Sequence, residues 1–411
     1  MRRMAWLDAL RGYAALTVVL FHLSPQMIGV DRHLAIYRQI DVGKYGVLLF
    51  FLVSGYVIPM SLERHGSLRR FWIGRLLRIY PAYLVTIALV TLLVTAGLMR
   101  WQGSLRAETV TGVLAHASMT PDLAGLRGVV RVFWTLSYEM VFYLIVTGLY
   151  AWRLHRLSAW WAAGLAIVSL LAGPYLPDDL FGDTFARRRV LAGVLLIVVA
   201  LVVLACLKRR FVKLAGVLGL AVVFVPALNG HPTADSTVTS SRQALTFLAV
   251  MFAGTVVYRW QHGQIGRFAG LTALTMVTLG LLGSQRTYAT TAALAVTFLF
   301  AYAMRNRAMP LVLPWLGRIS YSLYLLHVVL LFLTLRIVPE LGTQPVLVRL
   351  LAGVTYLIGA IGLAWLSYRM VELPAQRLVR KIAGPGPARP ITATERALPG
   401  TARGENERQS V

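Results

Sequence analysis

Three ionisable side chains interrupt the first apolar stretch of the chain. Asp8, Arg11 and His22 lie among leucines and valines in segment 7–22. On a helix, Arg11 and His22 would differ by only ~20° around the axis and by ~16 Å along it, so they share one face at two depths. An imidazole can act as a general acid or base, and a guanidinium binds anions. The spacing predicts that Arg11 anchors an anionic or polar group while His22 does chemistry farther along; alternatively, His22 only hydrogen-bonds a neighbouring helix.

Asp8 gives Arg11 a partner, because it precedes Arg11 by three residues and a helix brings residues at that spacing together. Pairing lowers the cost of placing both charges near a bilayer. We therefore predict a structural pair at this position.

Two later apolar stretches contribute matching groups. Glu139, in segment 133–143, is a carboxylate well inside its stretch, and His327 lies ~18 Å along a stretch that begins near 315. Isolated charges in lipid each cost several kcal/mol, so His22, Glu139 and His327 are expected to share one polar cavity. In the alternative interpretation, His327 is structural and bonds a backbone or tyrosine group.

Arginines gather at the start of the third apolar stretch. Arg75 and Arg78 are three residues apart, so they share a helix face and are suited to clamping phosphates. For the neighbouring Arg69 and Arg70 we prefer a topological signal and contact with lipid headgroups.

Ser54 lies beside Gly55 in the second apolar stretch. Small residues there usually allow close helix packing, whereas a serine nucleophile would need a nearby base. Packing is therefore the preferred interpretation of this pair.

The composition indicates what must position these groups. The chain has 411 residues, of which 57% are apolar and only 14% charged, and its mean hydropathy is +0.67. These values predict a multi-pass membrane protein in the bilayer. The net charge of +25 would suit a nucleic-acid binder, but such a protein would not place its basic groups between apolar runs of membrane length. We therefore expect no nucleic-acid partner.

The fold predicted is an all-α bundle of about 10 to 12 transmembrane helices with both termini in the cytoplasm. Arginine supplies nearly all of the positive charge, which together with abundant Ala, Val, Leu and Gly hints at a bacterial source and hence the cytoplasmic membrane. The expected spans are 5–24, 43–60, 77–99, 132–152, 159–176, 189–207, 211–228, 243–260, 267–283, 287–304, 314–336 and 346–369.

Charge sets the predicted topology. Every connection assigned to the inside is basic, as the positive-inside rule requires. The weakest point is segment 178–189, which would place Arg187, Arg188 and Arg189 outside. The first stretch is interpreted as a retained span, since no small-residue cleavage site follows it. One membrane domain is expected over 1–381, followed by a disordered cytoplasmic tail over 382–411. Cys206 alone cannot form an internal disulfide.

Six motifs occur in one order along the chain: LDALRGYAALTVVLFH, VLLFFLVSGYVI, RLLRIYPAYL, WTLSYE, ISYSLYLLH and SYRMVELP. Their order and spacing resemble the acyltransferase 3 family of integral-membrane acyltransferases. The step from Arg11 to His22 is similar to that family's signature of arginine, ten residues and histidine. The motifs span 7–374, and segment 157–310 carries none that we match and is expected to shape acceptor choice. The family is described with ten core spans, at the low end of our range.

The resemblance implies transfer of an acyl group, often acetyl, from cytoplasmic acyl-CoA to a hydroxyl. The acceptor would be a sugar, a lipid-linked or envelope glycan, or a natural product such as a macrolide. Acyl-CoA would be a co-substrate, and neither a permanently bound cofactor nor a metal is expected. We find no added esterase-like domain in the sequence, which favours a small or membrane-delivered acceptor.

Roles follow from combining the resemblance with the spacing. Arg75 and Arg78 would hold the phosphates of CoA, with Arg11 along the path. His22 would deprotonate the acceptor hydroxyl, and Glu139 would orient His22 or stabilise its imidazolium, as the carboxylate does in a Ser-His-Asp triad. An acyl-histidine intermediate is the alternative. Four further side chains are candidates for shaping the site or contacting the acceptor: His327, Ser54, Tyr324 and Trp134.

A different class of function is a proton-coupled secondary transporter, in which His22, Glu139 and His327 relay protons. Such carriers are diagnosed by paired broken helices in an inverted repeat, and we find none in the sequence. A hybrid stays open, in which the enzyme passes the acyl group through the membrane to an outside acceptor.

Overall fold

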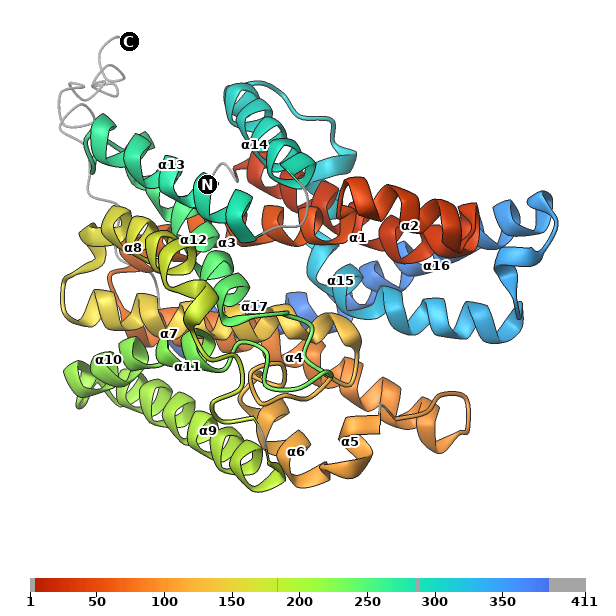
Figure 1. The fold of residues 1–411 in the computed structure, drawn as a ribbon, viewed down its shortest axis with the longest axis horizontal. Coiled ribbons are helices and arrows are strands. Elements are labelled where there is room, and N and C mark those ends of the chain that lie inside the picture. The colour runs from red at the N-terminus through yellow and green to blue at the C-terminus, as the bar shows by residue number, and fades with distance from the viewer. Residues whose placement is uncertain (1–3, 102, 183, 285–287, 384–411) are drawn as a thin grey trace, which may run out of the picture.

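The structure is a computed structural model that describes residues 4–101, 103–182, 184–284 and 288–383. Its described residues form helices and connecting turns without a β-strand, which confirms the predicted all-α class (Figure 1). The α-helices are α1 (Ala5–Ile28), α2 (Val30–Gln39), α3 (Val42–His65), α4 (Leu68–Thr95), α5 (Gly103–Ala107), α6 (Thr109–Ala117), α7 (Trp134–Ala151), α8 (Ser158–Leu171), α9 (Phe185–Lys208), α10 (Val212–Ala221), α11 (Phe224–Leu228), α12 (Ser241–Gln261), α13 (Arg267–Ser284), α14 (Tyr288–Ala303), α15 (Val312–Ile337), α16 (Val346–Ser367) and α17 (Leu373–Ala383).

Among the described residues, seven helical runs are long and apolar enough to cross a membrane. They are Val42–His65, Leu68–Thr95, Arg131–Ala151, Phe185–Lys208, Arg267–Ser284, Val312–Ile337 and Val346–Ala383. Each of the twelve predicted stretches contains a helix, but several of these are short: α8 has 14 residues and α10 has 10. The count of ten to twelve spans and the cytoplasmic placement of the termini stay predictions.

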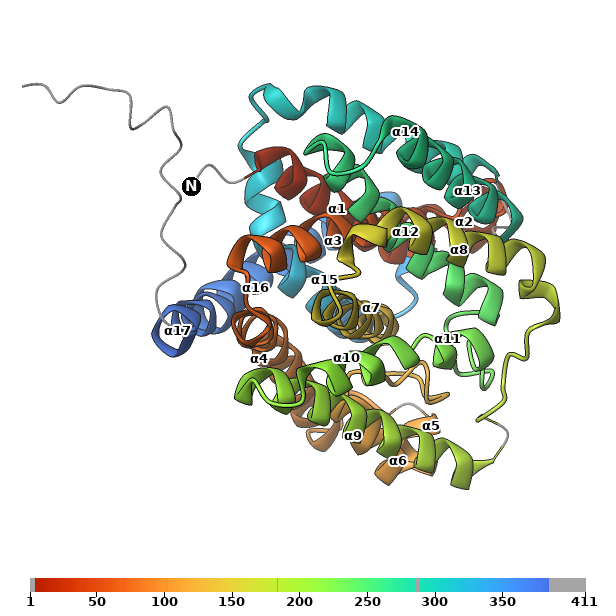
Figure 2. The ribbon, with the colours of Figure 1, turned by 90° about the vertical axis from the view of Figure 1, so that its left-hand side faces the viewer.

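Helix α7 lies at the centre of the bundle. Its apolar window is 94% buried against other helices, compared with 33% for α9 and 17% for the run that begins with α16. Figure 2 views α7 nearly end-on, with the other helices arranged around it. The polar side chains of α7 are therefore surrounded by protein rather than by lipid, which is where a charged group in a membrane protein is tolerated.

Helices α1 and α15 cross in close contact through two glycines. A Cβ atom at Gly12 would overlap the carbonyl oxygen of Leu313, and one at Gly317 would overlap the carbonyl oxygen of Asp8. Small residues allow helix backbones to approach in this way. The two helices run in the same direction from this crossing, and His22 and His327 each lie ten residues beyond their own glycine. The crossing therefore sets the distance between the two histidines.

Replacing Gly317 with alanine should destabilise the protein and lower its activity, because the new methyl group pushes α1 away from α15. Backbone shifts of this kind typically cost about 1–3 kcal/mol. Thermal unfolding in detergent and the rate of turnover measure the two effects. Gly362→Ala on α16 is the matched control, since no atom lies within 4 Å of a Cβ there. Equal unfolding temperatures for the two variants would contradict the proposed role of the crossing.

A second close crossing joins α3 and α12. A Cβ at Gly55 would overlap the carbonyl oxygen of Met251, and one at Gly254 would overlap that of Leu52. The geometry agrees with the packing interpretation of Gly55. Its neighbour Ser54 lies about 100° farther around α3 and lines a central cavity.

Helix α17 is described as far as Ala383. The expected end of the membrane domain at residue 381 stays a prediction. Residues 384–411, which make up nearly all of the predicted disordered tail, lie outside the described residues.

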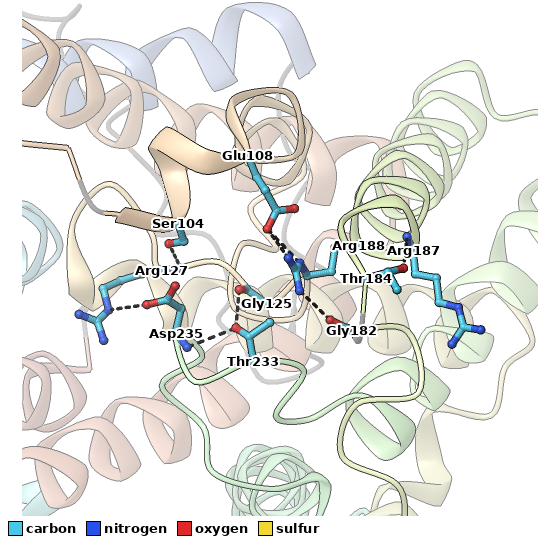
Figure 3. A network of polar contacts seen from close by, with 10 residues as sticks. All are labelled: Ser104, Glu108, Gly125, Arg127, Gly182, Thr184, Arg187, Arg188, Thr233 and Asp235. Carbon is cyan, nitrogen blue, oxygen red and sulfur yellow. Dashed lines mark hydrogen bonds and ion pairs between the residues drawn. The ribbon is translucent and has the colours of Figure 1, made fainter.

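Segment 103–131 and the loops around 182 and 233 are joined by polar contacts into one unit, called the cap below (Figure 3). Arg188, at the start of α9, is buried and donates two hydrogen bonds to Glu108 and one to the carbonyl oxygen of Gly182. Arg127 lies 3.9 Å from Asp235, and Thr233 donates to the carbonyl oxygen of Gly125. The charge of Arg188 is therefore neutralised inside the cap, which explains how an arginine can lie on the side predicted to be outside.

The cap also contains a carboxyl group whose ionisation opposes folding. Asp122 is buried and accepts hydrogen bonds from the backbone N–H of Thr237 and from the hydroxyl of Tyr138. Burial outweighs these bonds and raises the pKa of Asp122 to about 7. The unfolded chain has a pKa near 3.9 at an aspartate, so the folded state binds the extra proton between about pH 4 and 7.

The stability of the protein should therefore fall as pH rises through this window, by up to about 4 kcal/mol, and become flat above it. Asp122→Asn keeps the shape but removes the titration. The unfolding temperature measured in detergent from pH 5 to 8 should decline for the parent protein and decline less for the variant. Parallel curves would show that Asp122 is ionised throughout.

Candidate functional site

Two histidines from distant parts of the chain meet between α1 and α15. The Nε2 atom of His327 lies 3.3 Å from the Nδ1 atom of His22, and the ring centroids are 5.1 Å apart. His22 Nδ1 is also 2.9 Å from the carbonyl oxygen of Val18, and His327 Nδ1 is 3.1 Å from that of Leu323. His327 is fully buried and His22 is half-buried. The sequence predicted one polar cavity shared by His22, Glu139 and His327, and the structure brings two of the three, His22 and His327, into contact.

The carbonyl groups assign the protons of this pair. Each Nδ1 faces a carbonyl oxygen, which can only accept, so both rings are best satisfied as Nδ1–H tautomers. The Nδ1–H of His22 then points at two acceptors, Val18 O and the Nε2 lone pair of His327. This leaves Nε2 of His22 with a free lone pair, which is the atom a general base needs.

A cavity of about 60 Å³ lies among α1, α3, α4, α7 and α15 and is rich in charge. Three predicted anion-binding residues line it together, Arg11, Arg75 and Arg78, and Glu139 faces them from α7. Arg75 is buried, so its charge is held in the interior rather than at the surface. The spacing argument from the sequence therefore placed Arg75 and Arg78 correctly on one face of α4.

Glu139 belongs to this arginine cluster. It accepts a 2.5 Å hydrogen bond from the hydroxyl of Tyr143, and the guanidinium carbon of Arg75 lies 5.5 Å from the centre of the Tyr143 ring. The sequence predicted Glu139 as the partner of His22, but the side chain that contacts His22 in the described structure is His327. The difference arises because the carboxylate of Glu139 is held by Tyr143 in the arginine-lined cavity, whereas α15 runs directly beside α1.

A second cavity, of about 240 Å³, continues from the first toward the chain termini. The two cavities share Arg11, Val57, Arg78 and Tyr321, so they meet at these side chains. Asp8 and Arg11 both line the second cavity, and the exposed Arg64 and Arg318 flank it; the predicted pairing of Asp8 with Arg11 stays a prediction. An arginine-lined passage therefore leads from this end of the bundle into its centre.

The passage ends at Tyr324. This residue lines the central cavity, accepts a hydrogen bond from Thr135, and its ring centroid is 6.0 Å from that of His327. His22 lines neither of the two cavities. Tyr324 thus contacts both the central cavity and the histidine pair.

The two remaining candidates are placed differently. Ser54 lines the central cavity. Trp134 is buried in an aromatic cluster, with ring centroids 5.6 Å from Phe247 and 6.3 Å from Phe51. Its role in the described structure is packing at the start of α7.

Sequence reasoning missed Glu372. This buried carboxylate lies in a π-helical segment, Tyr368–Glu372, and accepts a 2.5 Å hydrogen bond from Ser322, whose hydroxyl is also 2.8 Å from that of Ser367. It lines the passage near Arg11 and Arg78. The signal was present in the motif SYRMVELP, whose glutamate ends the last apolar stretch.

Among the described residues, no group of three or more His, Cys, Asp or Glu side chains is arranged to hold a metal ion. The side chains gathered here supply imidazole, guanidinium, carboxyl and hydroxyl groups.

Comparison with known proteins supports the resemblance found in the motifs. The model of the acyltransferase 3 family, described as an acyltransferase domain, matches residues 4–183. Acyltransferase MdmB of Streptomyces mycarofaciens is 31% identical over 185 residues, which is 43% of this chain and 47% of that protein. Peptidoglycan O-acetyltransferase OatA of Listeria monocytogenes is 28% identical over 34% of this chain and 23% of its own length. No solved structure matches the chain.

These matches cover less than half of each relative. The matched segment 4–183 contains Arg11, His22, Arg75, Arg78 and Glu139, whereas His327 lies beyond it. The predicted resemblance to the acyltransferase 3 family is therefore confirmed, and it is anchored in the half of the chain that supplies most of the site.

Proposed function

We propose that this chain, with its acyltransferase 3 segment at residues 4–183, is a membrane-embedded O-acyltransferase that uses acyl-CoA. The observation that carries the proposal is the His22–His327 pair beyond the inner end of an arginine-lined passage. The names of the relatives include acyltransferase and O-acetyltransferase, which agrees with this chemistry. On the predicted topology the passage opens to the cytoplasm of a bacterial cell, where acyl-CoA is available.

The passage suits the two ends of acyl-CoA. Its phosphorylated nucleotide is anionic and would contact the arginines that line the passage. The step of ~16 Å along α1 from Arg11 to His22 is comparable to the length of the pantetheine arm. With the phosphates near Arg75, Arg78 and Arg11, the thioester would lie at Tyr324 and, once that side chain moves, beside His22.

The reaction follows from the assigned tautomers. Nε2 of His22 takes the proton of the acceptor hydroxyl as its oxygen attacks the thioester carbonyl carbon. The carbon–sulfur bond then breaks, and the CoA thiolate recovers the proton from the imidazolium. During the reaction the imidazolium would direct its Nδ1–H to Val18 O and His327 Nε2. These two hydrogen-bond acceptors would stabilise the protonated state of His22. Transfer through an acyl-histidine is the alternative route, and trapping with radiolabelled acyl-CoA distinguishes the two.

In this mechanism His327 is a positioning residue. His327→Ala should lower kcat by about 10–100-fold, since His22 loses an acceptor for Nδ1–H and can rotate. His327→Gln should recover part of the loss, because an amide oxygen can accept the same hydrogen bond. Steady-state kinetics on both variants provides the measurement. If the glutamine variant is no better than alanine, the hydrogen bond is not the source of the effect.

The acceptor we propose is a hydroxyl of a sugar-containing molecule, either an envelope glycan or a macrolide-type product, with acetyl or another short acyl group as the donor. One relative is named for peptidoglycan, and this supports the glycan class. The decisive assay follows release of free CoA from a panel of acyl-CoAs by purified protein, with and without glycan and macrolide acceptors. Acceptor-dependent release is expected.

The competing function is proton-coupled transport. Two results together would favour the transporter over the enzyme: substrate flux into liposomes that contain the protein but no acyl-CoA, and no release of CoA with any acceptor.

A further inference from the structure

A separate cleft of about 840 Å³ lies where the ends of α3, α7, α10 and α12 meet, on the side predicted to face the cytoplasm. Its volume is within the range of about 300–1,000 Å³ that small-molecule sites occupy. It shares no lining residue with the central cavity or with the passage described above. Glu63 lines the cleft, whereas its neighbours Met60 and Arg64 line the passage, so α3 separates the two spaces.

The cleft has a buried cation in its wall. Arg259 is only 2% exposed, donates to Gln264 and to Glu63, and has its Nε atom buried without a hydrogen-bond partner among the described residues. The Nδ1 atom of His155 is also buried without a partner there. Glu63 neutralises Arg259, so the two exposed arginines at the cleft, Arg153 and Arg156, leave it with an excess of positive charge.

Three exposed aromatic side chains lie within four residues in sequence of residues that line the cleft. The Nζ atom of Lys213 lies 5.6 Å from the ring centre of Trp152, which is 42% exposed. Trp160 and Phe211 are 75% and 78% exposed. Exposed tryptophans next to lysine and arginine are typical of the level where lipid headgroups meet water. The cleft is therefore expected to open at the headgroup layer rather than into bulk cytoplasm.

We propose that this cleft binds the phosphate headgroup of an anionic membrane lipid. Arg153 and Arg156 contact the phosphate, the unpartnered nitrogen of His155 contacts a headgroup hydroxyl, and the acyl chains lie against the exposed aromatic side chains. Basic pockets between helices on the cytoplasmic side are the usual sites of such lipids. Because Arg259 ties the cleft to Glu63 on α3, a bound lipid stabilises the helix that also forms the wall of the passage.

The test compares full-length protein in nanodiscs of phosphatidylcholine alone and nanodiscs containing phosphatidylglycerol. Phosphatidylglycerol should raise the unfolding temperature by about 2–4 °C, because a ligand that binds only the folded state stabilises it. Native mass spectrometry should show at least one retained phosphatidylglycerol. Arg153→Ala with Arg156→Ala should lose both effects, and Arg305→Ala with Arg307→Ala, which removes equal charge from another connection on the same side, should keep them.

An equal response of the two double variants to phosphatidylglycerol would overturn the proposal, since general surface charge would then account for the effect. Stabilisation by inorganic pyrophosphate in phosphatidylcholine discs, without any response to phosphatidylglycerol, would also overturn it and assign the cleft to a soluble anion. If the variant with both Arg153 and Arg156 replaced fails to fold, the response to phosphatidylglycerol is compared for Arg156→Gln alone. None of these measurements uses enzymatic activity, so they stand apart from the test of the proposed function.

Discussion

Replacing His22 with alanine is expected to lower acyl transfer by about 10²–10⁴-fold while the protein stays folded, because positioned general-base catalysis is worth that much. The Nε2 atom of His22 is the free basic atom of the pair, and His327 cannot replace it, since its own Nε2 faces His22. The measurement is acceptor-dependent release of CoA by purified protein. Binding of CoA to this variant should be unchanged.

The matched control is His65→Ala. His65 lies on α3 with its Nδ1 atom on the carbonyl oxygen of Ser61, four residues earlier, just as His22 lies on Val18. It lines neither the central cavity nor the passage. Turnover within about twofold of the parent is expected for this control. Substantial residual turnover in His22→Ala would remove His22 from the chemical step.

The second large effect is expected on binding of CoA. Arg75→Ala combined with Arg78→Ala should weaken CoA affinity by roughly 100-fold or more, because hydrogen bonds to charged groups contribute about 1.5–3 kcal/mol each. Isothermal calorimetry with CoA measures this directly. The loss should be smaller for dephospho-CoA if one of the two arginines contacts the 3′-phosphate.

Arg69→Ala with Arg70→Ala provides the comparison, since these residues lie one to two turns earlier on the same helix. Neither lines the central cavity or the passage, and Arg69 donates a hydrogen bond to the carbonyl oxygen of Ile382. CoA affinity should be preserved in this pair. Unchanged affinity in the Arg75 and Arg78 variant would mean that the phosphates are held elsewhere in the passage.

The spacing of charged residues predicted much of the site. The helix period placed Arg75 and Arg78 on one face and gave Arg11 and His22 their two depths. Similar depth suggested that His22, Glu139 and His327 would share one cavity. The depth of a residue along its helix does not tell which helices are neighbours. Glu139 and His327 were both expected near His22, and only the glycine crossing of α1 with α15 decides that His327 makes the contact.

The cap shows a second limit on what can be predicted from the sequence. Arg188 looked misplaced because positive charge is expected on the cytoplasmic side, and the rule counts charges without knowing their partners. Its partner Glu108 is 80 residues away in the sequence. Likewise, the carboxylate of Glu372 is kept in the interior by Ser322, 50 residues earlier. Long-range partners of this kind leave no local pattern.

The histidine pair joins residues that are 305 positions apart, one near the start of the chain and the other on α15. During synthesis the ribosome must therefore release nearly the whole protein before the two imidazoles can meet. In the proposed reaction, a nascent or truncated chain that lacks α15 is therefore expected to be inactive. Two separately expressed halves, divided in the loop before α12, should regain activity only when both are made in the same cell.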